Sequence, residues 1–347
     1  NIFLNIFLNV LLIAWMPQWI DSGLIEEGFL GYRSDWGVEY IFLSNLIANG
    51  LIIPFVWWKA GFFRFSLDKS VLAPMWKYSI PLLFMGLAGV NNELVSRLLF
   101  EYTLPSQFYA GLNSREAGGV FGATFRLAIL MNLVIQAFRY AAEPFFFRQS
   151  SEKNSPQLYA RVMHAFILFC TLLMIAISVN LNWIGPLFIK GEGYAEAFYI
   201  VPTLLFGYLL LGVYFNLSIW FKLTDHTRYS FWITLLGAMV TLVVILVFVP
   251  KIGYLGGAMS TLACYLVMTV VCYFLGQKYF PVPYQTGRGI LYLLLGFSIS
   301  YLGFYLDLGS FWMNFLAKNS LLLIFIGLIA ILEKKELSTF LRSLKKT

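Results

Sequence analysis

Apolar runs of about 20 residues return along the whole chain, and each is long enough to cross a hydrocarbon core of roughly 30 Å as an α-helix. Short polar connections separate the runs. The pattern predicts about ten spans, over residues 1–16, 37–58, 79–100, 119–147, 162–183, 197–221, 229–249, 255–276, 289–306 and 312–332. A membrane β-barrel would show shorter, alternating segments. We therefore expect an all-α, polytopic integral membrane protein.

Composition supports this prediction. Only 12% of the 347 residues are charged, against about 25% in a typical soluble domain, and 60% are hydrophobic. The formal charge of +7 resides largely in the connections, so it does not indicate a nucleic-acid partner. The chain starts at Asn1 inside an apolar run, without the basic start and small-residue cleavage site of a signal peptide, so we expect further helices upstream.

The cations alternate between the two sides of the predicted helices. One side holds four, namely Arg33, Arg115, Lys190 and Lys251. The opposite side holds sixteen: Lys59, Arg64, Lys69, Lys77, Arg148, Lys153, Arg161, Lys222, Arg228, Lys278, Arg288, Lys334, Lys335, Arg342, Lys345 and Lys346. By the positive-inside rule, the second side and the C-terminus are cytoplasmic.

Two predicted helices carry charges that a bilayer disfavours. On the span starting at Ser79, Glu93, Arg97 and Glu101 recur every four residues. On the next, Arg126 stands alone, and a polar stripe follows at steps of four, three and four: Asn132, Gln136, Arg139 and Glu143. At roughly 100° per residue, these four residues fall within about 60° of one another around the helix axis.

An ionisable group at mid-membrane costs about 3 kcal/mol, so it normally faces a partner or a watery cavity. Arginine can bind phosphate oxygens bidentately, which favours Arg97 and Arg126 as ligands of an anionic substrate. The alternatives are a static Glu93–Arg97 pair that only ties helices together, and an Arg139–Glu143 pair that snorkels to the interface. The candidate binding residues are Asn92, Glu93, Arg97, Arg126, Asn132, Gln136, Arg139 and Glu143.

No catalytic constellation emerges. The sequence lacks a phosphate-cradling glycine loop followed by Lys, and His164 and His226 are too isolated for a metal site. Cys170, Cys264 and Cys272 lie in apolar spans without metal-ligand spacing. We therefore expect a protein that is not an enzyme and uses no metal or cofactor.

The segments QAFRYAAEPFFF (136–147), NSPQLYARVM (154–163) and PKIGYLGGAMSTLACYLVMTVVCYFLGQKYFPVPY (250–284) resemble the bacterial polysaccharide-export flippases. These O-antigen and teichoic-acid flippases share a superfamily with the lipid II flippase and the multidrug/oligosaccharidyl-lipid exporters. The resemblance implies twelve to fourteen helices in two six-helix lobes around a central cavity. About four helices would precede Asn1, giving fourteen in all with the ten seen here.

On this resemblance, residues 1–58 are the last two helices of the N-terminal lobe, and 59–78 form a cytoplasmic amphipathic linker. Residues 79–280 form the C-terminal lobe, 281–333 two additional helices, and 334–347 a basic cytoplasmic tail. The resemblance also implies a bacterial cytoplasmic-membrane protein that carries an undecaprenyl-pyrophosphate-linked oligosaccharide to the outer leaflet, with proton or sodium as a possible coupling ion and membrane lipid as its surroundings.

Two alternatives to this function remain. A multidrug antiporter of the same superfamily would need acidic groups facing a cationic drug, and the intramembrane arginines disfavour it. A membrane glycosyltransferase, polymerase or ligase acting on lipid-linked sugars would be expected to have a large outer loop with catalytic Arg or His. The outer connections here are short.

Overall fold

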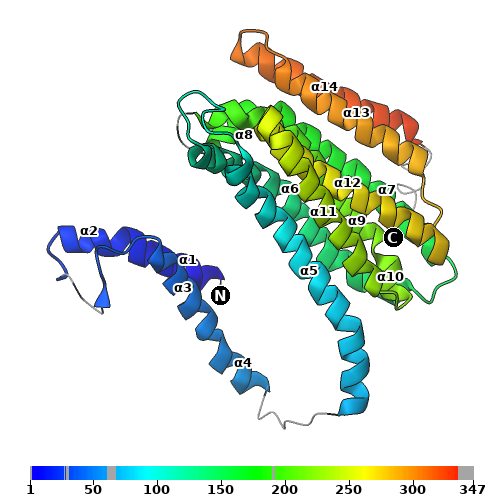
Figure 1. Cartoon of the computed structure of the whole chain (residues 1–347), viewed down its shortest axis with the longest axis horizontal. Helices are drawn as coiled ribbons and strands as arrows, with labels where there is room; N and C mark the ends of the chain where they lie inside the picture. The colour runs from blue at the N-terminus through cyan, green and yellow to red at the C-terminus, as the bar shows by residue number, and fades with distance from the viewer. Residues whose placement is uncertain are drawn as a thin grey trace. The chain divides into compact units, whose positions relative to one another are not determined.

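The computed structural model describes residues 2–26, 28, 31–60, 68–189, 191 and 193–334, except for the side chains of 60, 84, 85 and 87–94. Within these ranges every regular element is a helix (Figure 1). Nine helical stretches in the described part are long and apolar enough to cross a membrane. The predicted polytopic helical membrane protein is thus confirmed, whereas the two-lobe exporter fold and fourteen helices stay predictions.

The first of two units covers residues 1–72. It contains α1 (Ile2–Asn9), a π-helical stretch (Val10–Trp15), α2 (Met16–Asp21), α3 (Glu39–Gly50) and α4 (Ile52–Ala60). Helices α1 and α3 pack together, and Asn5 Nδ2 donates to Asn45 Oδ1 at 2.7 Å. Such an amide pair satisfies groups that would otherwise lie unpaired in hydrocarbon.

The second unit covers residues 73–347, of which the structure describes those up to 334. It contains most of α5 (Lys69–Thr103) and the following elements: α6 (Ser114–Gln149), α7 (Ser155–Val179), α8 (Leu181–Phe188), η3 (Tyr194–Ile200), α9 (Val201–Leu217), α10 (Ile219–Leu223), α11 (Arg228–Ile252), α12 (Tyr254–Tyr279), α13 (Thr286–Tyr305) and α14 (Phe311–Leu332). Its continuous apolar core draws on α6, α7, α9, α11 and α12.

Helix α5 (Lys69–Thr103) begins well before the predicted span at Ser79 and runs through Pro74 and Pro81. Proline removes one helical hydrogen bond and bends a helix, and the bilayer-spanning neighbours make such bends tolerable. The later part of the proposed linker is therefore helical. Residues 61–67 of that linker lie outside the described ranges, and the division into lobes stays a prediction.

Helix α13 packs against α7 along a seam of three glycines spaced seven residues apart: Gly289, Gly296 and Gly303. A Cβ at Gly296 would lie 2.1 Å from Thr171 Cγ2, and one at Gly303 would lie 2.5 Å from Val179 Cγ1. The absent side chains let the two backbones approach closely, which is how helices associate in membranes. This seam fixes α13 over α7.

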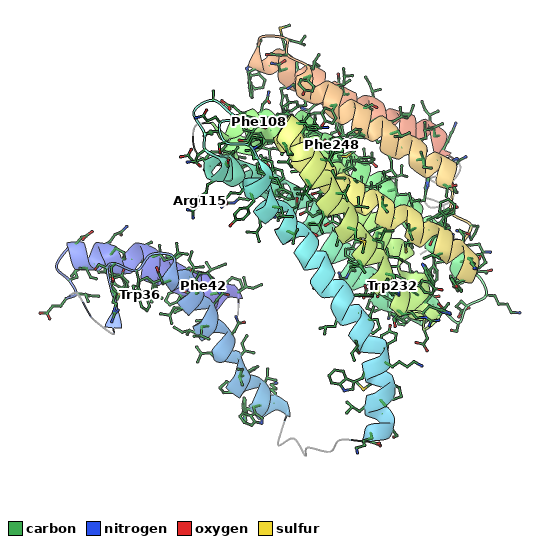
Figure 2. The ribbon with its side chains drawn as sticks, in the orientation of Figure 1. Trp36, Phe42, Phe108, Arg115, Trp232 and Phe248 are labelled. Atoms are coloured by element: carbon green, nitrogen blue, oxygen red, sulfur yellow. The ribbon has the colours of Figure 1, made fainter. Side chains whose placement is uncertain are left out.

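Both units expose large apolar side chains, as expected for surfaces that face lipid. Phe42 of the first unit and Trp232 of α11, both labelled in Figure 2, are two such side chains. These two side chains are 71% and 61% exposed. Exposure on this scale in a soluble monomer would mark an interaction surface, whereas on apolar helices of membrane-spanning length it is what contact with hydrocarbon requires.

Candidate functional site

Helix α6 is the element that positions the polar stripe. Its start is fixed by a capping box, in which Asn113 Oδ1 accepts from the backbone N–H of Glu116 and Glu116 returns a bond to that of Asn113. One face of α6 buries Phe121, Phe125 and Met131 against the core. The stripe follows on the same side of the helix toward its C-terminal end, where its four side chains are half-buried; Arg139 contacts Phe215 of α9, and Glu143 contacts Lys222 of α10.

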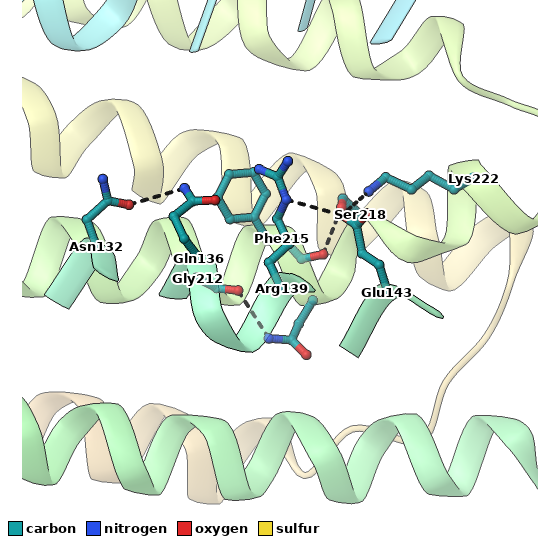
Figure 3. Close-up of polar contacts among 9 residues, drawn as sticks. Asn132, Gln136, Arg139, Glu143, Gly212, Phe215, Ser218 and Lys222 are labelled. Atoms are coloured by element: carbon teal, nitrogen blue, oxygen red, sulfur yellow. Dashed lines mark hydrogen bonds and ion pairs between the residues drawn. The ribbon is translucent and has the colours of Figure 1, made fainter. Parts of the chain in front are cut away.

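The first half of the stripe is uncharged. Gln136 Nε2 donates to Asn132 Oδ1 at 3.3 Å, one helical turn away (Figure 3). Both amides are partly buried and carry further donor and acceptor capacity beyond this single bond. They form a short polar track between apolar helices.

The second half of the stripe is an ion-pair cluster, and its third member comes from another helix. Arg139 Nε lies 3.3 Å from Glu143 Oε1, and Lys222 Nζ of α10 donates to the same oxygen at 2.6 Å. Figure 3 shows the two cations converging on Glu143 from different elements. Two cationic side chains face one carboxylate, so the formal net charge of the cluster is +1.

Burial of this cluster is graded. The Lys222 side chain is 9% exposed, whereas those of Arg139 and Glu143 are 32% and 33% exposed. The Arg139 guanidinium also stacks over the ring of Phe215 on α9, with Cζ 4.8 Å from the ring centroid. Cation–π contact and the carboxylate hold the guanidinium while leaving it open on one side. The cluster is therefore built to present a fixed cation.

The structure leaves a polar atom of Asn216, next to Phe215, without a described partner. Its Nδ2 donates to the carbonyl of Gly212 at 3.2 Å, but its buried Oδ1 has no hydrogen bond among the described residues. A buried acceptor without a partner costs roughly 1–3 kcal/mol, so a water or ligand donor is expected there. Sequence reasoning missed Phe215, Asn216 and Lys222, because helical spacing reveals only neighbours on the same helix.

The candidates on α5 are placed differently. Arg97 is partly buried, with its Cζ 4.6 Å from the ring centroid of Phe125 on α6. Ser96 contacts Ser260 of α12 at 3.3 Å between hydroxyl oxygens, so this turn of α5 lies on the core. The side chains of Asn92 and Glu93 lie outside the described residues. The proposed Glu93–Arg97 pair is therefore still a prediction.

Arg126 is exposed on α6, one residue past the buried Phe125. Successive residues differ by roughly 100° around a helix, so Arg126 points away from the contact that Phe125 makes with Arg97. No hydrogen bond or ion pair joins Arg126 to another described residue. The structure thus brings the four stripe residues into one line but does not join Arg126 to them.

A second cluster surrounds the buried carboxylate of Glu333, at the end of α14. Glu333 Oε1 accepts from Tyr292 Oη and lies 3.1 Å from His164 Nε2, and its Oε2 lies 3.4 Å from Arg288 Nη1. These partners come from α7 and α13. The carboxylate ties three helices together at one end of the unit. Nothing in the sequence spacing indicated this cluster, because its members are far apart in the chain.

Within the described ranges, no group of three or more His, Cys, Asp or Glu side chains could hold a metal ion. The stripe together with Lys222 can offer amides, two cations and one carboxylate to a ligand, which is chemistry suited to binding an anion with a polar extension. Comparisons of the chain with protein-family models, with curated proteins and with solved structures gave no match.

Proposed function

We propose that this protein moves an undecaprenyl-diphosphate-linked oligosaccharide from the inner to the outer leaflet of the bacterial cytoplasmic membrane, for surface polysaccharide biosynthesis. The observation that carries this proposal is the net positive Arg139–Glu143–Lys222 cluster at the end of a polar stripe on a membrane-spanning helix. Charged groups inside a membrane protein normally mark the path of a polar substrate. No covalent step is required.

The cluster suits a diphosphate. Arg139 can present guanidinium donors to phosphate oxygens, while Lys222 supplies a second charge from the opposite side of Glu143. Glu143 keeps both cations in place and offsets part of their charge when the site is empty. Asn132 and Gln136, farther along the stripe, can hydrogen-bond the hydroxyl groups of the first sugars.

Orientation follows from the positive-inside rule, which places the Lys222 end of the stripe at the cytoplasmic side. Arg126 is then about 26 Å farther along α6 than Glu143, at 1.5 Å per residue, and lies toward the outer leaflet. Arg97 and Arg126 would meet the diphosphate late in an alternating-access cycle, driven by a proton or sodium gradient. The chemistry at the inner end selects the anionic head first.

The test uses the natural protein that carries these residues, in a cell lacking its own oligosaccharide flippase. Surface polysaccharide is compared for the wild type, Arg139→Ala, Lys222→Ala, Arg97→Ala and Arg126→Ala, with protein abundance checked in each. Loss of one charge-assisted contact should lower export by roughly tenfold or more. We expect that loss for Arg139→Ala and Lys222→Ala at normal abundance.

Normal export by both of these variants would overturn the assignment of the cluster. If the wild-type protein does not restore export and instead raises resistance to cationic drugs, the result would favour the multidrug antiporter. Arg115→Ala, an exposed cation in the first turn of α6 outside the stripe, is the matched control and should export normally.

A further inference from the structure

An apolar groove runs between α12 and α13. Helix α12 packs on α9, α13 packs on α7, and α7 and α9 pack together, so α7 and α9 form the floor. The groove encloses about 490 Å³. Its walls are apolar side chains of the two flanking helices: Leu266, Val270 and Phe274 from α12, and Ile290 and Leu294 from α13.

These wall residues are not covered by protein within the described unit. Phe274 is 67% exposed, Ile290 56% and Val270 44%. The side chains stand on helices that cross the membrane, so hydrocarbon is the medium that meets them. A groove with such walls accepts a chain of methylene groups while covering very little polar surface.

The length of the groove matches one leaflet. On α9, the lining residues extend from Phe206 to Leu217. At 1.5 Å per residue this is about 16 Å along the helix, close to half of a hydrocarbon core of roughly 30 Å. A lipid chain entering from one membrane surface would fill the groove and end near the bilayer midplane.

One end of the groove is polar. Tyr284, Gln285 and Thr286 line both the groove and an adjoining pocket of about 670 Å³, which also holds Arg288 and Glu333. Among the described residues, both polar contacts of the half-exposed Arg288 guanidinium are made by Nη1, at 3.4 Å to Glu333 and 3.4 Å to Gln285. Its other N–H donors point to no described acceptor.

The charge at this end favours an anion. Lys278 in the last turn of α12 and Arg288 in the first turn of α13 flank the connection, and residues 228–306 contain no Asp or Glu. Among the described residues, the carboxylate that reaches Arg288 is that of Glu333, which is buried and is also held by Tyr292 and His164. The polar end therefore keeps an exposed excess of positive charge next to an apolar groove.

We propose that this groove binds one acyl chain of a membrane phospholipid, whose phosphate contacts Arg288. The apolar walls, the one-leaflet length and the cation at the interfacial end each correspond to one part of that lipid. The bound lipid would fill the space between α12, which packs on α9, and α13, which packs on α7. It would thereby stabilise the position of each helix relative to the other. This assignment stands independently of the transported substrate.

The experiment is native mass spectrometry of the purified, delipidated protein with phosphatidylglycerol or diacylglycerol of the same chains. Wild type should retain one phosphatidylglycerol molecule and bind diacylglycerol more weakly, because diacylglycerol lacks the phosphate. Val270→Trp and Ile290→Trp, from opposite walls, should each weaken binding of both lipids by roughly tenfold or more. Leu302→Trp, exposed on α13 outside the groove, is the matched control.

Arg288→Gln should abolish the preference for phosphatidylglycerol over diacylglycerol while leaving diacylglycerol binding unchanged. Thermal unfolding of each variant shows which ones are folded, and either wall variant alone suffices for the test. Equal binding by the folded wall variants and Leu302→Trp would overturn the proposal. So would displacement of phosphatidylglycerol by equimolar undecaprenyl phosphate, which would assign the groove to an isoprenoid chain instead.

Discussion

Glu143 of α6 accepts a 2.6 Å hydrogen bond from Lys222 of α10, although 79 residues separate the two in the chain. The same carboxylate oxygen lies 3.3 Å from Arg139 Nε. A contact between neighbours on one helix thereby becomes a three-residue cluster that spans two helices. The polar stripe of α6 is therefore part of a site to which two helices contribute charged side chains.

Removing the carboxylate should leave two cations facing each other. We expect Glu143→Gln to lower the free energy of unfolding by about 1–3 kcal/mol, between the values typical of exposed and buried ion pairs. Thermal unfolding in detergent, with Lys222→Ala and the double variant, gives the coupling of Glu143 with Lys222. Glu152→Gln, in the exposed α6–α7 connection, is the control. Additive effects of the two substitutions would contradict a direct pair.

The buried Glu333 carboxylate should anchor the end of α14. Glu333→Ala removes the acceptor of Tyr292 and the ion partner of Arg288, and we expect a loss of about 1–3 kcal/mol in the free energy of unfolding. Hydrogen exchange should show the last turns of α14 opening more often. The adjacent exposed Lys334→Ala should change neither quantity. Unchanged exchange in Glu333→Ala would refute the anchoring role.

The glycine seam predicts a steep size dependence at the α7–α13 contact. Gly296→Val places its branches where Thr171 Cγ2 already lies, so it should destabilise the protein by about 1–3 kcal/mol or force α13 outward. Gly327→Ala on α14 meets no atom within 4 Å and should be neutral or stabilising by up to about 1 kcal/mol. Melting temperatures measure both. Equal behaviour of the two variants would argue against close backbone contact.

Two asparagines at helix starts form a matched pair. Asn113 caps α6 through its side chain, whereas Asn154 at the start of α7 makes no side-chain cap bond. Asn113→Ala should therefore cost about 1 kcal/mol of unfolding free energy, and Asn154→Ala much less. Comparing the two midpoints of thermal unfolding tests this difference. A larger loss for Asn154→Ala would contradict the capping box.

The sequence was sufficient for nine of the ten predicted spans, because a membrane imposes length and apolarity on each of them; the predicted span 79–100 lies in the helix α5 but is not among the nine described stretches that are long and apolar enough to cross. It was also sufficient for the line Asn132–Gln136–Arg139–Glu143, because a helical period places these residues on one face. It could not supply Lys222 as the partner of Glu143, since contacts between helices depend on how they pack. Helix α5 starts at Lys69, ten residues before the predicted span at Ser79, because the segment predicted as part of the linker is helical and continuous with the apolar run.

Partners across helices explain the remaining misses. Glu333 looked like the end of an apolar run, and only folding brings Tyr292, His164 and Arg288 around it. The α13 glycines carried a seven-residue period, and the close contact with α7 gives that period its meaning. Arg126 was grouped with Arg97 by charge alone. In the structure Arg97 contacts the ring of Phe125, whereas Arg126 is exposed and points away from that contact.

The most direct test of the central claim measures lipid translocation by the purified natural protein in liposomes. An undecaprenyl-diphosphate-linked oligosaccharide is placed in one leaflet, and its arrival in the other is followed for wild type, Arg139→Ala, Lys222→Ala and Arg115→Ala. The account predicts translocation by wild type and Arg115→Ala, and a loss of roughly tenfold or more in the two cluster variants. Translocation at the same rate in all four proteins would contradict it. So would a rate that exceeds that of protein-free liposomes in none of them.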